Sequence, residues 1–100
     1  MYRQGRSVST RYLVLHWFKR EEGAAEPRLG LAVPKKLGNA VVRNRTKRHL
    51  KEAWRARIEE IPAGNDYVLV AREGLPEAVE ARGAEWLGER VAEVVQKASA

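Results

Sequence analysis

The chain has 100 residues, of which 44% are hydrophobic, so it is long enough for one compact domain with a single core. It has no cysteine, which excludes disulfide bonds, thiolate metal ligands and a thiol nucleophile. No apolar stretch could span a bilayer and the first nine residues lack the apolar core of a secretory signal, so we expect a soluble, cytoplasmic protein. The net charge of +6 indicates a polyanionic partner.

Two segments in the first third of the chain alternate as β-strands do. Within residues 9–19, two sets of side chains alternate along the chain. Leu13, Leu15 and Trp17 form one set, and Tyr12, Val14, His16 and Phe18 form the other. Residues 20–27 contain charges, a glycine and small residues, which is typical of an exposed connection. Residues 28–33 alternate again, with the small residues Gly30 and Ala32 on one side. The segment 28–33 is therefore predicted to be a second strand.

The middle of the chain predicts a long amphipathic helix from Ala40 to about Ile61. Asn39 ends a short loop and is a suitable N-cap, while Pro62 and Gly64 provide the stop. The apolar side chains fall within roughly 120° of a helical wheel. They are Val42, Thr46, Leu50, Ala53, Trp54 and Ile61. We expect this arc to pack on the sheet.

The opposite arc of this helix is cationic. Residues 43–57 hold seven basic residues and one acid, Glu52, and seven minus one accounts for the whole net charge of +6. Like charges at three- and four-residue spacings destabilise a helix by about 0.2–0.5 kcal/mol per pair, so stability alone does not favour this pattern. Arginine forks spaced a turn apart can instead bind successive phosphates. Arg43 falls inside the apolar arc, and we expect it to point toward the sheet, where a single nucleic-acid strand would neutralise it.

The last part of the chain predicts one more strand and one more helix. The strand covers residues 67–72 after a turn at residues 63–66, and Pro76 opens the helix. An apolar stripe follows on this helix: Trp86, Leu87, Val91, Val94 and Val95. We expect Trp54 and Trp86 to pack in the core.

The segment from Gly30 to Arg55 resembles the signature of the bacterial ribonuclease P protein component. Its Arg-Asn-Arg helix follows a Lys-Lys-x-Gly-x-Ala-Val loop, residues 66–72 look like the family's later strand, and residues 1–8 look like the end of its first helix and the following turn. Nearly the whole chain is covered, as a single domain of residues 1–100 whose N-terminal helix is shortened. His16 stands where the family commonly has tyrosine, and Pro34 replaces a usual serine.

The resemblance implies an α+β fold like that of domain 2 of ribosomal protein S5, with a small sheet packed by helices and a left-handed β-α-β crossover. It also implies a subunit of a ribonucleoprotein that removes the 5′ leader of precursor tRNA. The RNA subunit and the Mg²⁺ ions it binds would carry out the chemistry, with no catalytic residue and no metal held by this chain alone. The expected partners are the catalytic RNA and precursor tRNA, with no membrane and no obligate protein partner.

The resemblance and the wheel together predict two sets of contact residues. The set expected to bind the catalytic RNA is Lys35, Lys36, Asn44, Arg45, Lys47, Arg48, Lys51 and Arg55. The set expected to bind the precursor tRNA leader is Tyr2, Tyr12, His16 and Arg43, with Tyr12 on the same side of the strand as His16.

Other functions remain open on the residues alone. A generic structured-RNA-binding protein without a role in tRNA processing is the main alternative, and a basic helix would also serve to read duplex DNA. An RRM-type domain is disfavoured because residues 28–33 carry no aromatic side chain. A protein-only nuclease would need paired imidazoles or clustered carboxylates, and it is disfavoured because His16 and His49 are isolated histidines.

Overall fold

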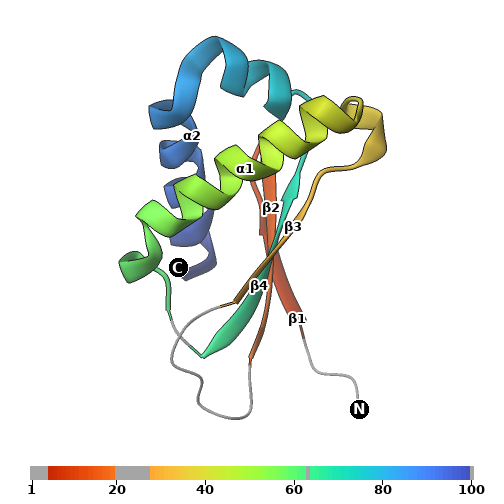
Figure 1. Ribbon diagram of the computed structural model, residues 1–100. Helices are drawn as coiled ribbons and strands as arrows, with labels where there is room; N and C mark the ends of the chain where they lie inside the picture. Colours follow the sequence, from red (N-terminus) through yellow and green to blue (C-terminus); the bar gives the residue numbers. More distant parts are fainter. Residues whose placement is uncertain (1–4, 20–27, 63, 100) are drawn as a thin grey trace.

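A computed structural model describes residues 5–19, 28–62 and 64–99, which fold into one sheet and two α-helices (Figure 1). The strands are β1 (Gly5–Ser9), β2 (Leu13–Lys19), β3 (Arg28–Ala32) and β4 (Asn65–Ala71). The helices are α1 (Ala40–Ala56) and α2 (Leu75–Ser99), with short 3₁₀ turns η1 (Lys35–Leu37) and η2 (Ile58–Glu60). Tyr2 and the expected connection at residues 20–27 lie outside the described residues.

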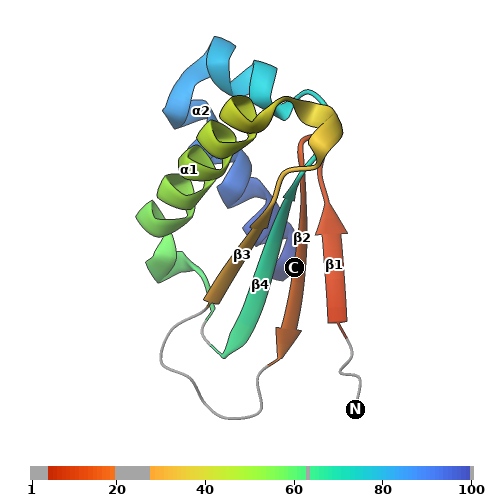
Figure 2. The same ribbon diagram turned by 45° about the vertical axis from the view of Figure 1, so that its right-hand side comes forward.

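The strand order in the sheet is β1-β2-β4-β3. Neighbouring strands are antiparallel except β3 and β4, which are parallel and are joined through α1. In Figure 2 both of these strands run upward, β4 lies to the right of β3 and the helices lie behind the sheet, so the crossover is left-handed. The α+β architecture with a left-handed crossover is therefore confirmed.

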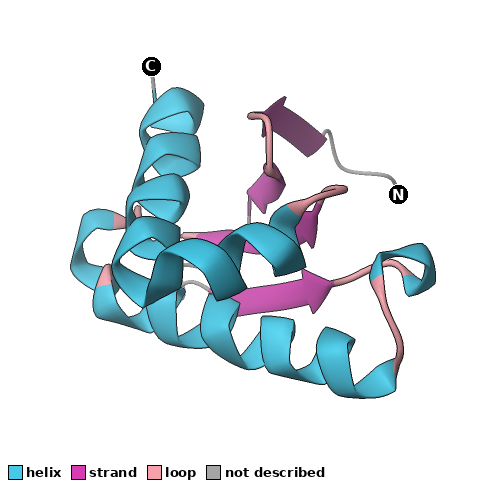
Figure 3. Ribbon diagram, turned by 90° about the horizontal axis from the view of Figure 1, so that it is seen from above, coloured by secondary structure: helices cyan, strands magenta, loops and turns pink. Residues whose placement is uncertain are grey.

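The core lies between the sheet and the two helices, which share one side of the strands (Figure 3). The predicted alternation is confirmed, because Leu13, Leu15 and Leu69 are fully buried under the helices. The helices contribute Leu50, Trp54, Leu87, Val91 and Val94. The alternate strand residues, such as Val14 and Val68, are half-buried on the opposite face, which no helix of the described chain covers.

The strand expected at residues 9–19 begins only at Leu13, and residues 5–19 together form a hairpin. Residues 5–8, which resembled the end of a helix and the following turn, lie instead in the first strand of this hairpin, so that expectation is wrong for them. This first strand, β1, ends at Ser9, and a turn closed by the Thr10 amide and the Leu13 carbonyl (2.8 Å) leads into β2. The prediction missed β1 because its residues are mostly polar and exposed. An edge strand of this kind is held by backbone pairing to β2 and leaves little hydrophobic pattern in the sequence.

The predicted start of α1 is confirmed, but its predicted end is wrong. The Asn39 side chain accepts a hydrogen bond from the Val42 amide (2.9 Å) and caps the helix. The helix ends at Ala56, five residues early, and η2 then directs Ile61 into the core. The strand β4 begins at Asn65, so the turn before it is shorter than expected.

The last helix is bent. Gly83 has φ 89° and interrupts the helical backbone, so α2 consists of two helical segments (Figure 1). The apolar stripe is buried as predicted, except that Trp86 is half-buried. Among the described residues, no helix is long and apolar enough to cross a lipid bilayer.

Candidate nucleic-acid interface

The outer face of α1 is a row of cations directed away from the core. Arg48, Lys51 and Arg55 are exposed and Lys47 is half-buried, with the Asn44 amide exposed beside them. Within the described part of the chain, none of these four cations forms an ion pair with a carboxylate. We call these four residues the α1 cationic face. Their charge has no carboxylate partner among the described residues, so it is available to an external anion.

The N-terminal end of α1 extends this positive surface. Lys35 and Lys36 are exposed on η1, which Gly38 and Asn39 separate from the start of α1. The first turn of α1 contains no acidic residue, so the positive end of the helix dipole is not neutralised locally. The two lysines therefore continue the positive potential past the end of the helix.

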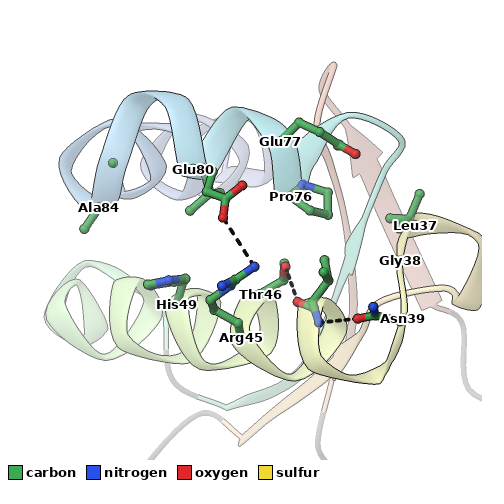
Figure 4. A pocket seen from close by; sticks show the side chains of 13 residues that line it. Leu37, Gly38, Asn39, Arg45, Thr46, His49, Pro76, Glu77, Glu80 and Ala84 are labelled. Atoms are coloured by element: carbon green, nitrogen blue, oxygen red, sulfur yellow. Dashed lines mark hydrogen bonds and ion pairs between the residues drawn. The ribbon is translucent and has the colours of Figure 1, made fainter.

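Arg45 does not point outward as the wheel predicted. Its Nη2 lies 3.3 Å from Oε2 of Glu80 on α2, across a cleft of about 350 Å³ between the two helices (Figure 4). His49 and the buried Thr46 line the same cleft. The Thr46 hydroxyl donates to the Val42 carbonyl (2.8 Å). The wheel failed here because it places residues around α1 without knowing which side α2 covers.

Arg43 is half-buried, and its expected direction toward the sheet stays a prediction. Its Nε donates to the Gly38 carbonyl (3.2 Å), so the turn between η1 and α1 supplies one acceptor that the sequence did not reveal. The terminal guanidinium nitrogens form no hydrogen bond with the described residues. They remain available to an anion at this end of the sheet.

The uncovered face of the sheet is mixed, with the apolar Val14, Val68, Val70 and Phe18 beside Ser7, His16 and the Arg28–Asp66 ion pair. His16 lies on β2 between Ser7 of β1 and Val68 of β4 in the strand register. Phe18 lies over Gly5, where its ring leaves no room for a side chain. This face could accept a flat, partly apolar group such as a nucleobase, with the imidazole of His16 as a polar or stacking contact.

Tyr12 does not share the side of His16, and that expectation is wrong. Its ring meets Trp86 of α2 edge to face, with ring centroids 5.0 Å apart and an interplanar angle of 81°. Tyr12 precedes β2 and belongs to the turn, where strand alternation does not apply. It therefore lies with the helices, away from the uncovered sheet face.

Two features of this surface were not anticipated from the sequence. Glu80, which pairs with Arg45, left no signal because the contact joins two helices distant along the chain. Arg82 and Arg90 both lie over the Trp86 ring. Arg90 follows Trp86 by four residues in the same helical segment, a spacing that could have identified this pair, whereas Arg82 lies before the bend at Gly83 and its contact could not be read from spacing.

The fold and this surface define a small α+β protein with a cationic helix carried on the crossover between two parallel strands. Residues 1–98 match the family model described as Ribonuclease P. The chain belongs to the ribonuclease P protein family.

Relatives and solved structures agree with this assignment. The ribonuclease P protein component of Carboxydothermus hydrogenoformans is 44% identical over 72 residues, covering 72% of this chain and 62% of the relative. That of Listeria innocua is 40% identical, covering 72% and 60%. The RNase P protein structure from Thermotoga maritima has a TM-score of 0.84 at 30% identity, covering 94% of this chain and 84% of the other. The match thus spans about three fifths of the length of these two curated relatives.

Proposed function

We propose that this chain is the protein subunit of a ribonuclease P ribonucleoprotein, which removes the 5′ leader from precursor tRNA. In this proposal the RNA subunit performs the endonucleolytic hydrolysis with Mg²⁺ ions that it binds itself. The chain holds the RNA subunit and the leader and supplies no catalytic residue. The observation that carries the proposal is the α1 cationic face, whose charges have no carboxylate partner among the described residues, in a member of this family.

The α1 cationic face and its extension suit a structured RNA. Four cations without carboxylate partners in the described chain follow one helix, and exposed lysines continue past its start. Arginine and lysine side chains spaced along a helix can contact successive phosphates of a folded RNA and fix its orientation. The proposed contact set is Lys35, Lys36, Asn44, Arg45, Lys47, Arg48, Lys51 and Arg55. Arg45 would have to leave Glu80, or share its charge, to take part.

The leader is proposed to lie along the uncovered sheet face toward Arg43. His16 offers a ring for stacking on an unpaired base, and Arg43 offers terminal donors to a phosphate. The position of Tyr12 beside Trp86 does not support a place for it in this contact. Tyr2 stays a prediction, since it lies outside the described residues.

Reconstitution tests the proposal directly. The purified chain is added to a bacterial ribonuclease P RNA at a Mg²⁺ concentration where the RNA alone is nearly inactive, and cleavage of the leader from precursor tRNA is measured. We expect cleavage at the mature 5′ end to be restored, and restored less by an Arg48→Gln, Lys51→Gln variant at equal concentration. No restoration by the folded chain would refute the proposal.

The alternative is a structured-RNA-binding protein without a role in tRNA processing. The same experiment separates the two functions, because such a protein would bind the RNA without restoring cleavage. Competition with duplex DNA completes the comparison. A preference for the duplex over ribonuclease P RNA would point to a DNA-binding helix.

A further inference from the structure

A second group of cations lies on α2, before and after the bend at Gly83, and on the β1–β2 turn, apart from the α1–α2 cleft. A cleft of about 280 Å³ opens between the β1–β2 turn and α2, lined by Arg11, Tyr12, Arg82, Trp86, Arg90 and Glu93. We call it the arginine–aromatic cleft. It shares no lining residue with the α1–α2 cleft and contains none of the proposed contacts of α1.

Aromatic rings hold the three guanidinium groups in place. The guanidinium carbons of Arg82 and Arg90 lie 5.9 Å and 5.6 Å from the centre of the Trp86 ring, and that of Arg11 lies 5.4 Å from the centre of the Tyr12 ring. The two rings support each other edge to face. Stacking on a ring orders a guanidinium without using its N–H donors, which therefore stay free for an anion.

Two of these arginines are unpaired in the described chain and the third is partly paired. Arg11 and Arg82 form no ion pair with a carboxylate in the described part of the chain. The buried Nε of Arg90 lies 3.6 Å from Oε1 of Glu93, within ion-pair distance but beyond hydrogen-bond distance, and its Nη2 lies 3.9 Å from Oε1 of Glu89. The donors open to a ligand therefore belong mainly to Arg11 and Arg82.

We propose that the arginine–aromatic cleft binds a phosphodiester of single-stranded RNA, independently of the α1 cationic face. Three arginines against Glu93 favour an anion, and guanidinium forks match phosphate oxygens. RNA is favoured over an acidic peptide because a base can stack on the flat outer side of a guanidinium that is itself supported by a ring, so a strand brings stacking groups together with its phosphates. The proposal holds whichever RNA is the partner of α1.

Nuclear magnetic resonance of the full chain tests the proposal at the site itself. The signals of the Trp86 indole N–H and the Arg90 Nε–H are followed during titration with hexauridylate, and the amides of α1 report binding at the other surface. We expect saturable shifts at Trp86 and Arg90. In Arg82→Gln, the dissociation constant read at Trp86 should rise about three- to fivefold. Its log–log dependence on salt should weaken by about 0.7 for one lost phosphate contact.

Arg6→Gln is the matched control, since it removes one exposed arginine from β1 away from the cleft and should leave the Trp86 titration unchanged. Shifts at α1 with none at Trp86 and Arg90 would overturn the proposal while leaving the proposed function intact. Equal effects of Arg82→Gln and Arg6→Gln would also overturn it. If inorganic phosphate bound as tightly as hexauridylate, the cleft would be a site for a free anion. If a hexaglutamate peptide did so, the cleft would be a site for an acidic protein. Either result would reject RNA as the ligand.

Discussion

Removing charge from the α1 cationic face should change the salt dependence of RNA binding by a calculable amount. The face contains four cations without carboxylate partners in the described chain, Lys47, Arg48, Lys51 and Arg55, whereas Arg45 is already paired with Glu80. Each phosphate neutralised on structured RNA contributes about −0.9 to the slope of log affinity against log salt, as in a duplex, so six contacts, made by these four residues together with Lys35 and Lys36, give about −5.4. Affinity should then fall about fortyfold between 0.1 M and 0.2 M salt.

The double variant Arg48→Gln, Lys51→Gln should reduce the size of this slope by about 1.8, to about −3.6, so the same change of salt weakens binding only about twelvefold. Fluorescence anisotropy of labelled ribonuclease P RNA, titrated with the full chain at several salt concentrations, measures both slopes. Arg6→Gln removes one charge elsewhere and should keep the parent slope. A flat dependence for the parent, or equal slopes for the parent and the double variant, would refute the electrostatic reasoning.

Three further predictions concern single residues. Leu50→Ala, at a fully buried position under α1, should lower the free energy of unfolding by about 2–5 kcal/mol in a denaturant titration, and a loss well below that range would contradict the packing described. Glu80→Gln releases Arg45 and should raise the affinity for RNA by up to about fivefold. The control Glu73→Gln also removes an exposed acid and should raise this affinity less. Equal gains in affinity for the two variants would show that net charge alone matters. Arg43→Ala should weaken binding of precursor tRNA more than binding of mature tRNA. Arg48→Ala should chiefly weaken assembly with the catalytic RNA. If both variants lost affinity for the same RNAs to the same extent, the two surfaces would not be separate.

Much of the fold follows from patterns within single segments. Alternation predicted the buried faces of β2 and β3, and the Asn39 cap marked the start of α1 correctly. The polar edge strand β1 escaped prediction because its contacts are backbone pairs with β2. The helical wheel likewise sorted α1 into a buried and an exposed side.

The remaining features depend on contacts between distant segments. The wheel could not show that α2 lies against the Arg45 side of α1, nor that the Gly38 carbonyl accepts from Arg43. Tyr12 was assigned to the wrong face because a turn, set by pairing of β1 with β2, begins before it. The left-handed crossover was expected only from the family resemblance, since chain chirality favours the opposite hand.

The placement of α1 within the crossover gives it a fixed geometry. Its two ends connect to β3 and β4, which are directly hydrogen-bonded to each other, and its inner side is anchored by Leu50 and Trp54. A shift of α1 along the sheet would therefore require breaking either this strand pair or the core. If the catalytic RNA lies on the outer side of α1 and the leader on the sheet, the protein acts as a rigid spacer, and the distance it sets between the two RNAs is built into the backbone.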